Sequence, residues 1–326
     1  MADLTTTFVG LNLRSPVIIG ACPVSRRVES IQAAEEAGAG AIVIYSLFQE
    51  QIELETKEVD EALAVGSESY PEALTYFPKL EHAGPREHVM WVEKTRKCVK
   101  FPLIGSLNAY SVGSWVHYAK QLESAGCDAL ELNLYAVQTD PQKTASVVEQ
   151  EALDVIASVK DAVSIPVAVK LSPFYTALAN FASRVVEAGA DGLVLFNRFY
   201  QPVIDVQTES LSVTINYSTP EEQRLPMRWI AILSAQLDVD FCASTGVHSG
   251  EDAAAYILAG AKAVQTASHV LKNGVQAIGR INSELSEWMD SKGYSCVKDF
   301  QGKLNSRSVS DPFVFERAHY INALLS

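Results

Sequence analysis

Short apolar runs alternate with longer amphipathic stretches along most of this chain. The runs PVIIG (16–20), AIVIY (41–45), FPLIGSL (101–107) and IPVAVKL (165–171) show little polar alternation. Parallel strands that are covered on both faces have this pattern, and the stretches between the runs have helical length. We count eight strand-plus-helix units, so the pattern predicts an α/β protein with a parallel sheet.

The joints between helices and strands also repeat. AGAGA, AGCDA, AGADG and AGAKA each place a glycine after the last apolar turn of a predicted helix, directly before a strand. Glycine is common at helix C-termini. Four such joints favour a (β/α)8 TIM barrel over a doubly wound sheet, because GACPVS after the first strand is not a dinucleotide fingerprint. We expect a single domain over residues 1–326.

Two insertions interrupt this rhythm, near residues 48–84 and 197–225. Each follows the carboxyl end of a predicted strand, which is the face where barrel enzymes hold their active sites. Long loops on that face are usually lids or substrate walls. Residues 5–13 alternate loosely and are expected to form a small hairpin or a strand across the barrel floor.

Composition and charge narrow the function classes. The net charge of −13 without a long basic run argues against a nucleic-acid or anionic membrane partner. Five cysteines without CxxC spacing and six scattered histidines give little support for a disulfide framework, a metal site or a protein-borne iron–sulfur cluster. No apolar run is long enough for a signal peptide or a membrane span, so we expect a cytoplasmic protein with reduced thiols.

Two turns of small residues near the end of the chain predict an anion site. A strand over 239–243 precedes one turn and a helix that starts near Ser249, and a strand over 263–266 precedes the other. Small residues let the backbone approach a ligand, and N–H groups at a helix start attract anions. Barrels often bind phosphate after strands seven and eight; two ordinary βα turns are the alternative. The predicted phosphate cup consists of Thr245, Gly246, Ala267 and Ser268.

Polar residues at other strand ends are candidates for chemistry. Lys170 closes an apolar strand, and a buried ammonium needs an anionic or electron-rich partner. A salt bridge to Glu131 on the neighbouring strand is the structural alternative. Asn133 and Asn197 also end apolar strands, where a carboxamide suits the edge of a planar ring or ties a loop. The remaining candidates at strand ends are Tyr45, Ser46, Asn108, Tyr135 and Arg198.

Five motifs in order resemble the dihydroorotate dehydrogenase family, closest to its class 1A branch. SPVIIGAC, GAGAIVIYS, DALELNLYAV, VAVKLSPFYT and STGVHSGEDAAAYILAGAKAVQTAS are similar to NPxxxASG, GAxxxTKS, xELNLSCPN, VKLPPYFD and TGGIxTGxDAxxxxLxGAxxxQxGTA. The C-terminal MDSKGYSCVKDFQGKL is also similar to the family's end. The resemblance implies an FMN-binding (β/α)8 barrel, an oxidoreductase of pyrimidine biosynthesis that acts on CH–CH bonds, and a homodimer. The predicted FMN-binding residues are Ala21, Cys22, Tyr45, Ser46, Asn108, Asn133, Lys170, Asn197, Thr245, Gly246, Ala267 and Ser268.

The chain departs from the family on the substrate side. Ala136 stands where class 1A enzymes have the cysteine base, and alanine cannot accept a proton. Gln138 replaces an asparagine, Tyr45 replaces the lysine of TKS, and Arg198 replaces a serine. The NSMGLPN substrate loop has no counterpart, and SESYPEALTYF occupies its place.

These departures favour a flavoenzyme that acts on a small, anionic substrate other than dihydroorotate. Its catalytic candidates are Lys170, Tyr135, Asn133, Asn197 and Arg198. Tyr135 or Tyr45 would supply a proton, although packing against the flavin explains both and a phenol is a poor base at neutral pH. Arg198 would clamp a carboxylate or phosphate, or form a surface ion pair.

Two other functions remain open at this point. One is true dihydroorotate oxidation with a substitute base. The other is a flavin-carrying electron-transfer or binding subunit, for which an iron–sulfur cluster would have to come from a partner chain.

Overall fold

The computed structural model of the chain describes residues 2–48, 85–108, 112–199, 201–212, 216–316, 321 and 324–325. The predicted insertion near 48–84, with SESYPEALTYF in it, lies outside the described residues except at its first position.

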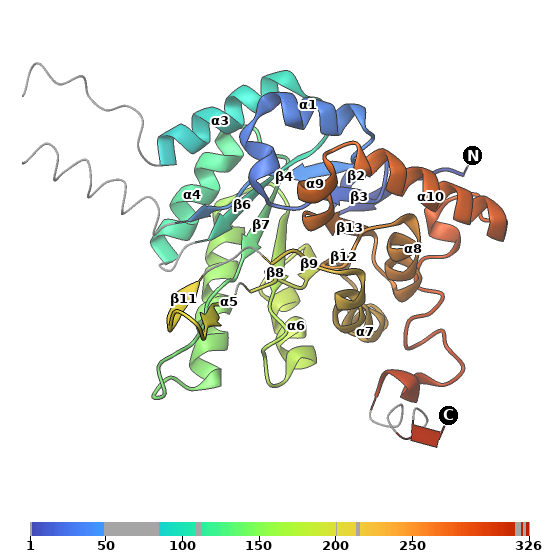
Figure 1. Cartoon of the computed structure of the whole chain (residues 1–326). Helices are drawn as coiled ribbons and strands as arrows, with labels where there is room; N and C mark the ends of the chain where they lie inside the picture. The colour runs from blue at the N-terminus through green and yellow to red at the C-terminus, as the bar shows by residue number, and fades with distance from the viewer. Residues whose placement is uncertain are drawn as a thin grey trace, which may run out of the picture.

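A closed barrel of eight parallel strands forms the centre of the protein (Figure 1). The strands pair in the order β3, β4, β6, β7, β8, β9, β12 and β13, and β13 pairs with β3 to close the ring. The (β/α)8 TIM barrel predicted from the sequence is therefore confirmed. The strands are β3 (Val17–Ile19), β4 (Ala41–Val43), β6 (Leu103–Asn108), β7 (Ala129–Asn133), β8 (Val167–Leu171), β9 (Gly192–Leu195), β12 (Asp240–Ser244) and β13 (Ala263–Thr266), with a short β5 (Leu47–Phe48) beside β6.

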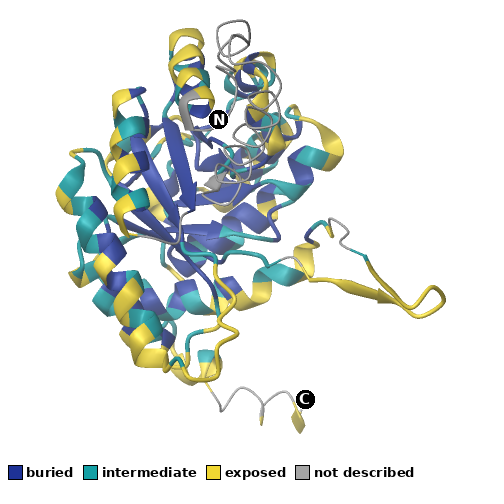
Figure 2. Cartoon of the chain, turned by 90° about the vertical axis from the view of Figure 1, so that its left-hand side faces the viewer, coloured by how far each residue is buried: buried dark blue, intermediate teal, exposed yellow. Residues whose placement is uncertain are grey.

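Helices cover the outside of this barrel, and their outer faces are the exposed part of the chain (Figure 2). Because the strands are buried on both faces, they are apolar along most of their length. The helices are α1 (Val28–Glu36), α3 (Pro85–Cys98), α4 (Val112–Ser124), α5 (Ala145–Ala162), α6 (Leu178–Glu187), α7 (Arg224–Leu233), α8 (Gly250–Ala259), α9 (Ser268–Asn273) and α10 (Ala277–Lys292). Short 3₁₀ turns are η1 (Pro23–Arg26), η3 (Pro220–Gln223), η4 (Val297–Asp299) and η5 (Pro312–Phe315).

The amino-terminal hairpin closes the bottom of the barrel, as one of the two sequence expectations had it. Strands β1 (Thr6–Phe8) and β2 (Leu11–Leu13) pair antiparallel. The Val9 amide donates to the Asp240 carboxylate at the start of β12, over 2.8 Å. Phe8 is buried among the small side chains that fill the barrel interior.

The barrel interior changes from apolar to polar toward the carboxyl ends of the strands. Ala129, Ala168 and Ala263 belong to one buried cluster inside the barrel. Side chains two positions apart on a strand point to the same face. The residues two positions after these alanines are Glu131, Lys170 and Gln265, so they form the next layer inside the barrel. All three are buried. A charged layer therefore forms the upper end of the apolar core.

The insertion after β9 is only partly a wall of the barrel mouth. It forms a hairpin of β10 (Val203–Asp205) and β11 (Ser210–Ser212) that projects from the barrel and is exposed along most of its length (Figure 2). Residues 216–218, after the hairpin, return to the mouth. Among the helices of the described residues, none combines the length and the apolar character that a membrane crossing requires.

Candidate functional site

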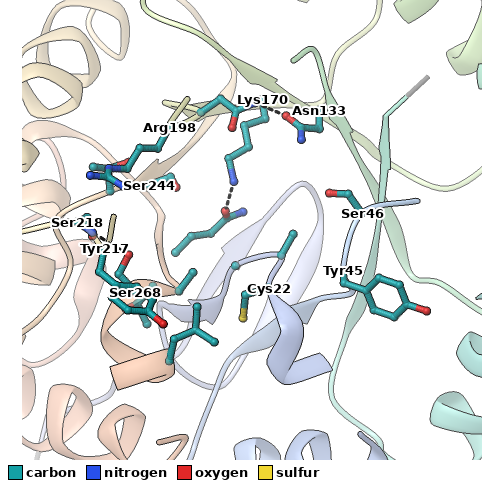
Figure 3. Close-up of a pocket in the computed structure, with 18 of the residues that line it drawn as sticks. Cys22, Tyr45, Ser46, Asn133, Lys170, Arg198, Tyr217, Ser218, Ser244 and Ser268 are labelled. Carbon is teal, nitrogen blue, oxygen red and sulfur yellow. Dashed lines mark hydrogen bonds between the residues drawn. The ribbon is translucent and has the colours of Figure 1, made fainter. Parts of the chain in front are cut away.

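A cavity of about 550 Å³ opens at the carboxyl ends of the barrel strands (Figure 3). It brings together residues that are far apart in the sequence, because every parallel strand ends at this face. Of the predicted site residues, it is lined by Ala21, Cys22, Tyr45, Ser46, Asn133, Tyr135, Lys170, Asn197, Arg198, Thr245, Gly246, Ala267 and Ser268.

Lys170 lies at the centre of the cavity wall, within a buried polar triangle (Figure 3). Its ammonium donates to Gln265 Oε1 at 2.9 Å and approaches Glu131 Oε1 at 3.3 Å. Gln265 Nε2 in turn donates to Glu131 Oε2. The salt bridge to Glu131 considered from the sequence is present, yet Lys170 still faces the cavity.

Asparagine side chains connect the ends of three strands. Asn197 Nδ2 donates to Asn133 Oδ1, and both residues line the cavity. Asn108 does not line it: its Nδ2 donates to the backbone carbonyl of Asn133 at 2.6 Å. Asn108 was predicted to contact the flavin, and in the structure it instead positions a residue that faces the cavity.

The two small-residue turns leave backbone donors available, as the predicted cup requires. In the described part of the chain, the N–H groups of Gly246, Ala267 and Ser268 donate to no other protein group. Gly246 has φ +76°, and a Cβ there would lie 2.7 Å from the amide nitrogen of Gln223. A glycine is therefore required at this turn on two grounds, backbone conformation and space.

At the start of α8, in contrast, most of the backbone donors are already used. The amides of His248 and Ser249 both donate to Asp252 Oδ2 at 2.9 Å, and that of Gly250 donates to Glu284 Oε2 at 2.7 Å. Ser249 and Asp252 form a capping box. The protein's own carboxylates therefore accept from three amides at this helix start, so the donors available to the predicted cup come mainly from the two small-residue turns.

The two tyrosines proposed as proton donors lie in different surroundings. Figure 3 shows the Tyr45 ring directed away from the centre of the cavity. It packs at 4.7 Å from the His88 ring, and the Arg26 guanidinium lies 5.0 Å from its centroid. Tyr135 lines the cavity and packs at 4.3 Å from the Phe199 ring. The geometry therefore supports Tyr135 over Tyr45 as a group near a ligand.

Arg198 forms the ion pair that was the structural alternative for it, and its role as a clamp stays a prediction. Its Nε donates to Glu222 Oε1 at 3.0 Å, and its Nη1 donates to the carbonyl of Asn216. It also lines the cavity. The ion pair neutralises part of its charge and holds the guanidinium at the cavity rim. Ala136 is exposed and is not among the lining residues.

Several lining residues were not predicted from the sequence. Gln265 lies inside β13, two positions beyond a buried alanine, so period-2 alternation from Ala263 would have indicated its inward direction. Tyr217 and Ser218 come from the insertion that was expected to form a lid or wall, but no sequence pattern singles out these two residues within it. Among the described residues, no group of three or more histidine, cysteine or acidic side chains is arranged to hold a metal ion.

This chain resembles known proteins that are described as dihydroorotate dehydrogenases or their subunits. Residues 80–289, more than half of the chain, match the family model described as dihydroorotate dehydrogenase. A protein of Thermoplasma acidophilum, the catalytic subunit of dihydroorotate dehydrogenase B (NAD(+)), is 26% identical over 93% of this chain and 99% of its own. The same subunit of Methanothermobacter thermautotrophicus is 26% identical over 92% and 97%. A putative dihydroorotate dehydrogenase A (fumarate) of Aeropyrum pernix is 27% identical over the same shares, so relatives of both kinds match.

Cys22 gives a prediction about protonation at the cavity. Burial raises the pKa of its thiol to about 11, although a hydrogen bond from the Val24 backbone and the charge of Lys170 lower it. The thiol is therefore neutral at pH 7 and a poor nucleophile. We expect its alkylation by iodoacetamide to accelerate about tenfold per pH unit between pH 8 and 10, as the thiolate fraction grows.

Peptide mass spectrometry measures this rate, with Cys98 as the internal control because it is exposed. Cys98 is expected to react first at pH 7. Equal rates for Cys22 and Cys98 at that pH would contradict the assignment.

Proposed function

The chain belongs to the dihydroorotate dehydrogenase family, and we propose that it is an FMN-dependent oxidoreductase that acts on a CH–CH bond of a small anionic substrate other than dihydroorotate. The observation that carries the proposal is the cavity that Lys170 faces between the asparagine pair and the two small-residue turns. We further propose a single FMN-binding barrel domain and a cytoplasmic location, which the five free cysteines support.

The residues present fit an FMN molecule. The free N–H groups of Gly246, Ala267 and Ser268 suit a phosphate, which accepts hydrogen bonds from backbone donors. Asn133 and Lys170 would face the polar edge of the flavin ring, where a carboxamide donates and accepts and an ammonium donates. Lys170 has three N–H groups and uses two of them for Gln265 and Glu131, which leaves one for a ligand.

When bound, FMN would accept a hydride from the CH–CH bond, and the proton released as that bond becomes C=C must go to a base. Lys170 would stabilise the negative charge that the flavin gains. Of the described lining residues, Glu131 is held by Lys170 and Gln265, and Cys22 is a neutral thiol. We propose Tyr135 for this step because it lines the cavity, whereas Ala136, at the position of the family's base, cannot accept a proton.

The charges at the cavity favour an anionic substrate. Arg26, Lys170 and Arg198 line it, whereas Glu131 is the acidic side chain among the described lining residues. Glu222 offsets part of this charge through its ion pair with Arg198, and the remaining positive charge contrasts with the net charge of −13 of the whole chain. A carboxylate or phosphate would therefore be attracted to this face of a protein that otherwise repels it.

A homodimer is part of the proposal, and the hairpin after β9 supports it. Ile204 and Leu211 are paired across β10 and β11, so their side chains share one face, and they are 69% and 72% exposed. Val203 and Val206 are exposed beside them. An apolar ribbon of this kind is typical of a contact surface. The relatives named as catalytic subunits also support a second partner that accepts electrons, for which an iron–sulfur protein is a candidate.

The FMN site is tested with Gly246→Ala. The added Cβ would clash with Gln223, and the alanine would have to keep a positive φ, so the turn must move. We expect the dissociation constant for FMN to increase at least tenfold, which corresponds to about 1.4 kcal/mol. Quenching of flavin fluorescence on binding measures it.

Gly10→Ala is the matched control. Gly10 has φ +80° in the β1–β2 turn, and a Cβ there meets no atom within 4 Å. It shares the backbone strain but lies at the opposite end of the barrel. FMN affinity that falls equally in both variants, or in neither, would contradict the placement of the phosphate.

The substrate proposal predicts slow turnover of dihydroorotate. Loss of a positioned base typically costs 10²–10⁴-fold, so we expect the FMN-loaded protein to stay at least about 100-fold below an ordinary turnover number of about 10 s⁻¹. The rate is measured with fumarate and with NAD⁺ as acceptors.

The same sample is then photoreduced anaerobically and offered 2-oxo acids and enoates, whose reduction reoxidises the flavin. Reoxidation shows that the flavin is competent, so a slow dihydroorotate rate cannot be ascribed to damaged protein. Dihydroorotate oxidation at an ordinary enzyme rate would overturn the substrate proposal.

The dimer is tested with Ile204→Glu combined with Leu211→Glu. Two charges on the paired face must be desolvated if the hairpin is in the interface, so we expect light scattering to show a dissociation constant at least tenfold higher. Met90→Glu, at a 56% exposed position on α3, is the control and is expected to leave the dimer intact. A double variant as dimeric as the parent would exclude the hairpin.

A further inference from the structure

We propose that Glu131 and Gln265 are positioning residues that set the redox potential of the bound flavin through Lys170. This inference rests on the proposed FMN function. The observation behind it is the closed triangle of hydrogen bonds among the three side chains, which come from β7, β8 and β13.

The triangle fixes the orientation of every member. The Gln265 amide accepts from the Lys170 ammonium through Oε1 and donates to the Glu131 carboxylate through Nε2. Reversing the amide would place a donor against the ammonium and an acceptor against the carboxylate. Because the amide contacts both charged groups, Gln265 holds Glu131 and Lys170 at a fixed separation.

Burial makes the pair electrostatically effective. The Glu131 side chain is 1% exposed and that of Lys170 is 11% exposed. Beneath them lies the layer of Ala129, Ala168 and Ala263, which contributes no polar group apart from its backbone. Water therefore screens these charges little, and the charge of Glu131 acts on whatever occupies the cavity above Lys170.

The sign of the effect follows from the charge gained on reduction. Lys170 alone would favour the reduced flavin, since the flavin gains a negative charge when it takes up a hydride. The Glu131 carboxylate lies 3.3 Å from the ammonium and cancels part of that attraction. Glu131 therefore lowers the midpoint potential below the value that an uncompensated lysine would give, and the reduced flavin passes its electrons on more readily.

The inference predicts opposite shifts in two variants of the FMN-loaded protein. Glu131→Gln keeps the shape and removes the negative charge, so the equilibrium constant for flavin reduction should rise at least tenfold, or about 30 mV for a two-electron couple. Gln265→Glu places a second carboxyl against Glu131, and the two share one proton until the pH is high enough to ionise both. At that pH the added negative charge should lower the midpoint. Anaerobic potentiometric titration followed by flavin absorbance measures both.

Glu149→Gln is the matched control. Glu149 pairs with Arg184 Nη1 at 2.8 Å, between α5 and α6 outside the barrel, and its loss should leave the midpoint unchanged. A merely structural role of the triangle would lower thermal stability in both triangle variants without moving the two midpoints in opposite directions.

The outcomes separate this inference from the function on which it rests. A parent protein that binds no flavin would overturn the proposed function and this inference with it. Bound flavin whose midpoint is the same in the parent and in Glu131→Gln, or moves in one direction in both triangle variants, would overturn the inference alone.

Discussion

The parallel hydrogen-bond ladder that closes on itself between β13 and β3 is the constraint on which the site depends. Closure brings the carboxyl ends of all eight strands to one rim, so that residues as far apart in the sequence as Gly20 and Leu271 line one cavity. It also turns alternate side chains of every strand toward one axis. The apolar layer and the charged layer above it are both consequences of this geometry, with the hairpin at the other end excluding water from below.

Most of the barrel could be predicted from the sequence because its signals are local. Apolar runs and glycine joints place the strands and helices to within a few residues; β13 was expected at 263–266 and lies there. The site candidates at strand ends could also be predicted from the sequence, because the position of a residue along a strand determines the end of the barrel at which its side chain lies. Lys170, Asn133 and Asn197 were found in this way, and all three line the cavity.

The remainder depends on contacts between distant segments, which a local pattern does not contain. Gln265 acquires its importance from Lys170, 95 positions earlier in the chain. The ring of Tyr45 is directed outward because Arg26 and His88, on other elements, pack against it. The sequence at the start of α8 predicts an anion site, but in the structure the Gly250 amide donates to Glu284 from α10. In each case a contacting residue from a distant segment determines the role or orientation, and the local sequence does not contain it.

Thr245 has φ +85°, a conformation that costs a non-glycine residue of order 1–3 kcal/mol. The Tyr256 hydroxyl donates to its carbonyl at 2.7 Å, and Tyr256 is fully buried in α8. The turn that presents the Gly246 amide is thus held by the helix packing behind it. A ligand that enters meets donors that are already oriented, so its affinity is not reduced by the entropy of ordering a loop. The two sides of the cavity thus differ in what holds them: contacts with the buried Tyr256 fix the Gly246 turn, whereas Tyr217 and Ser218 come from the loop after the β10–β11 hairpin.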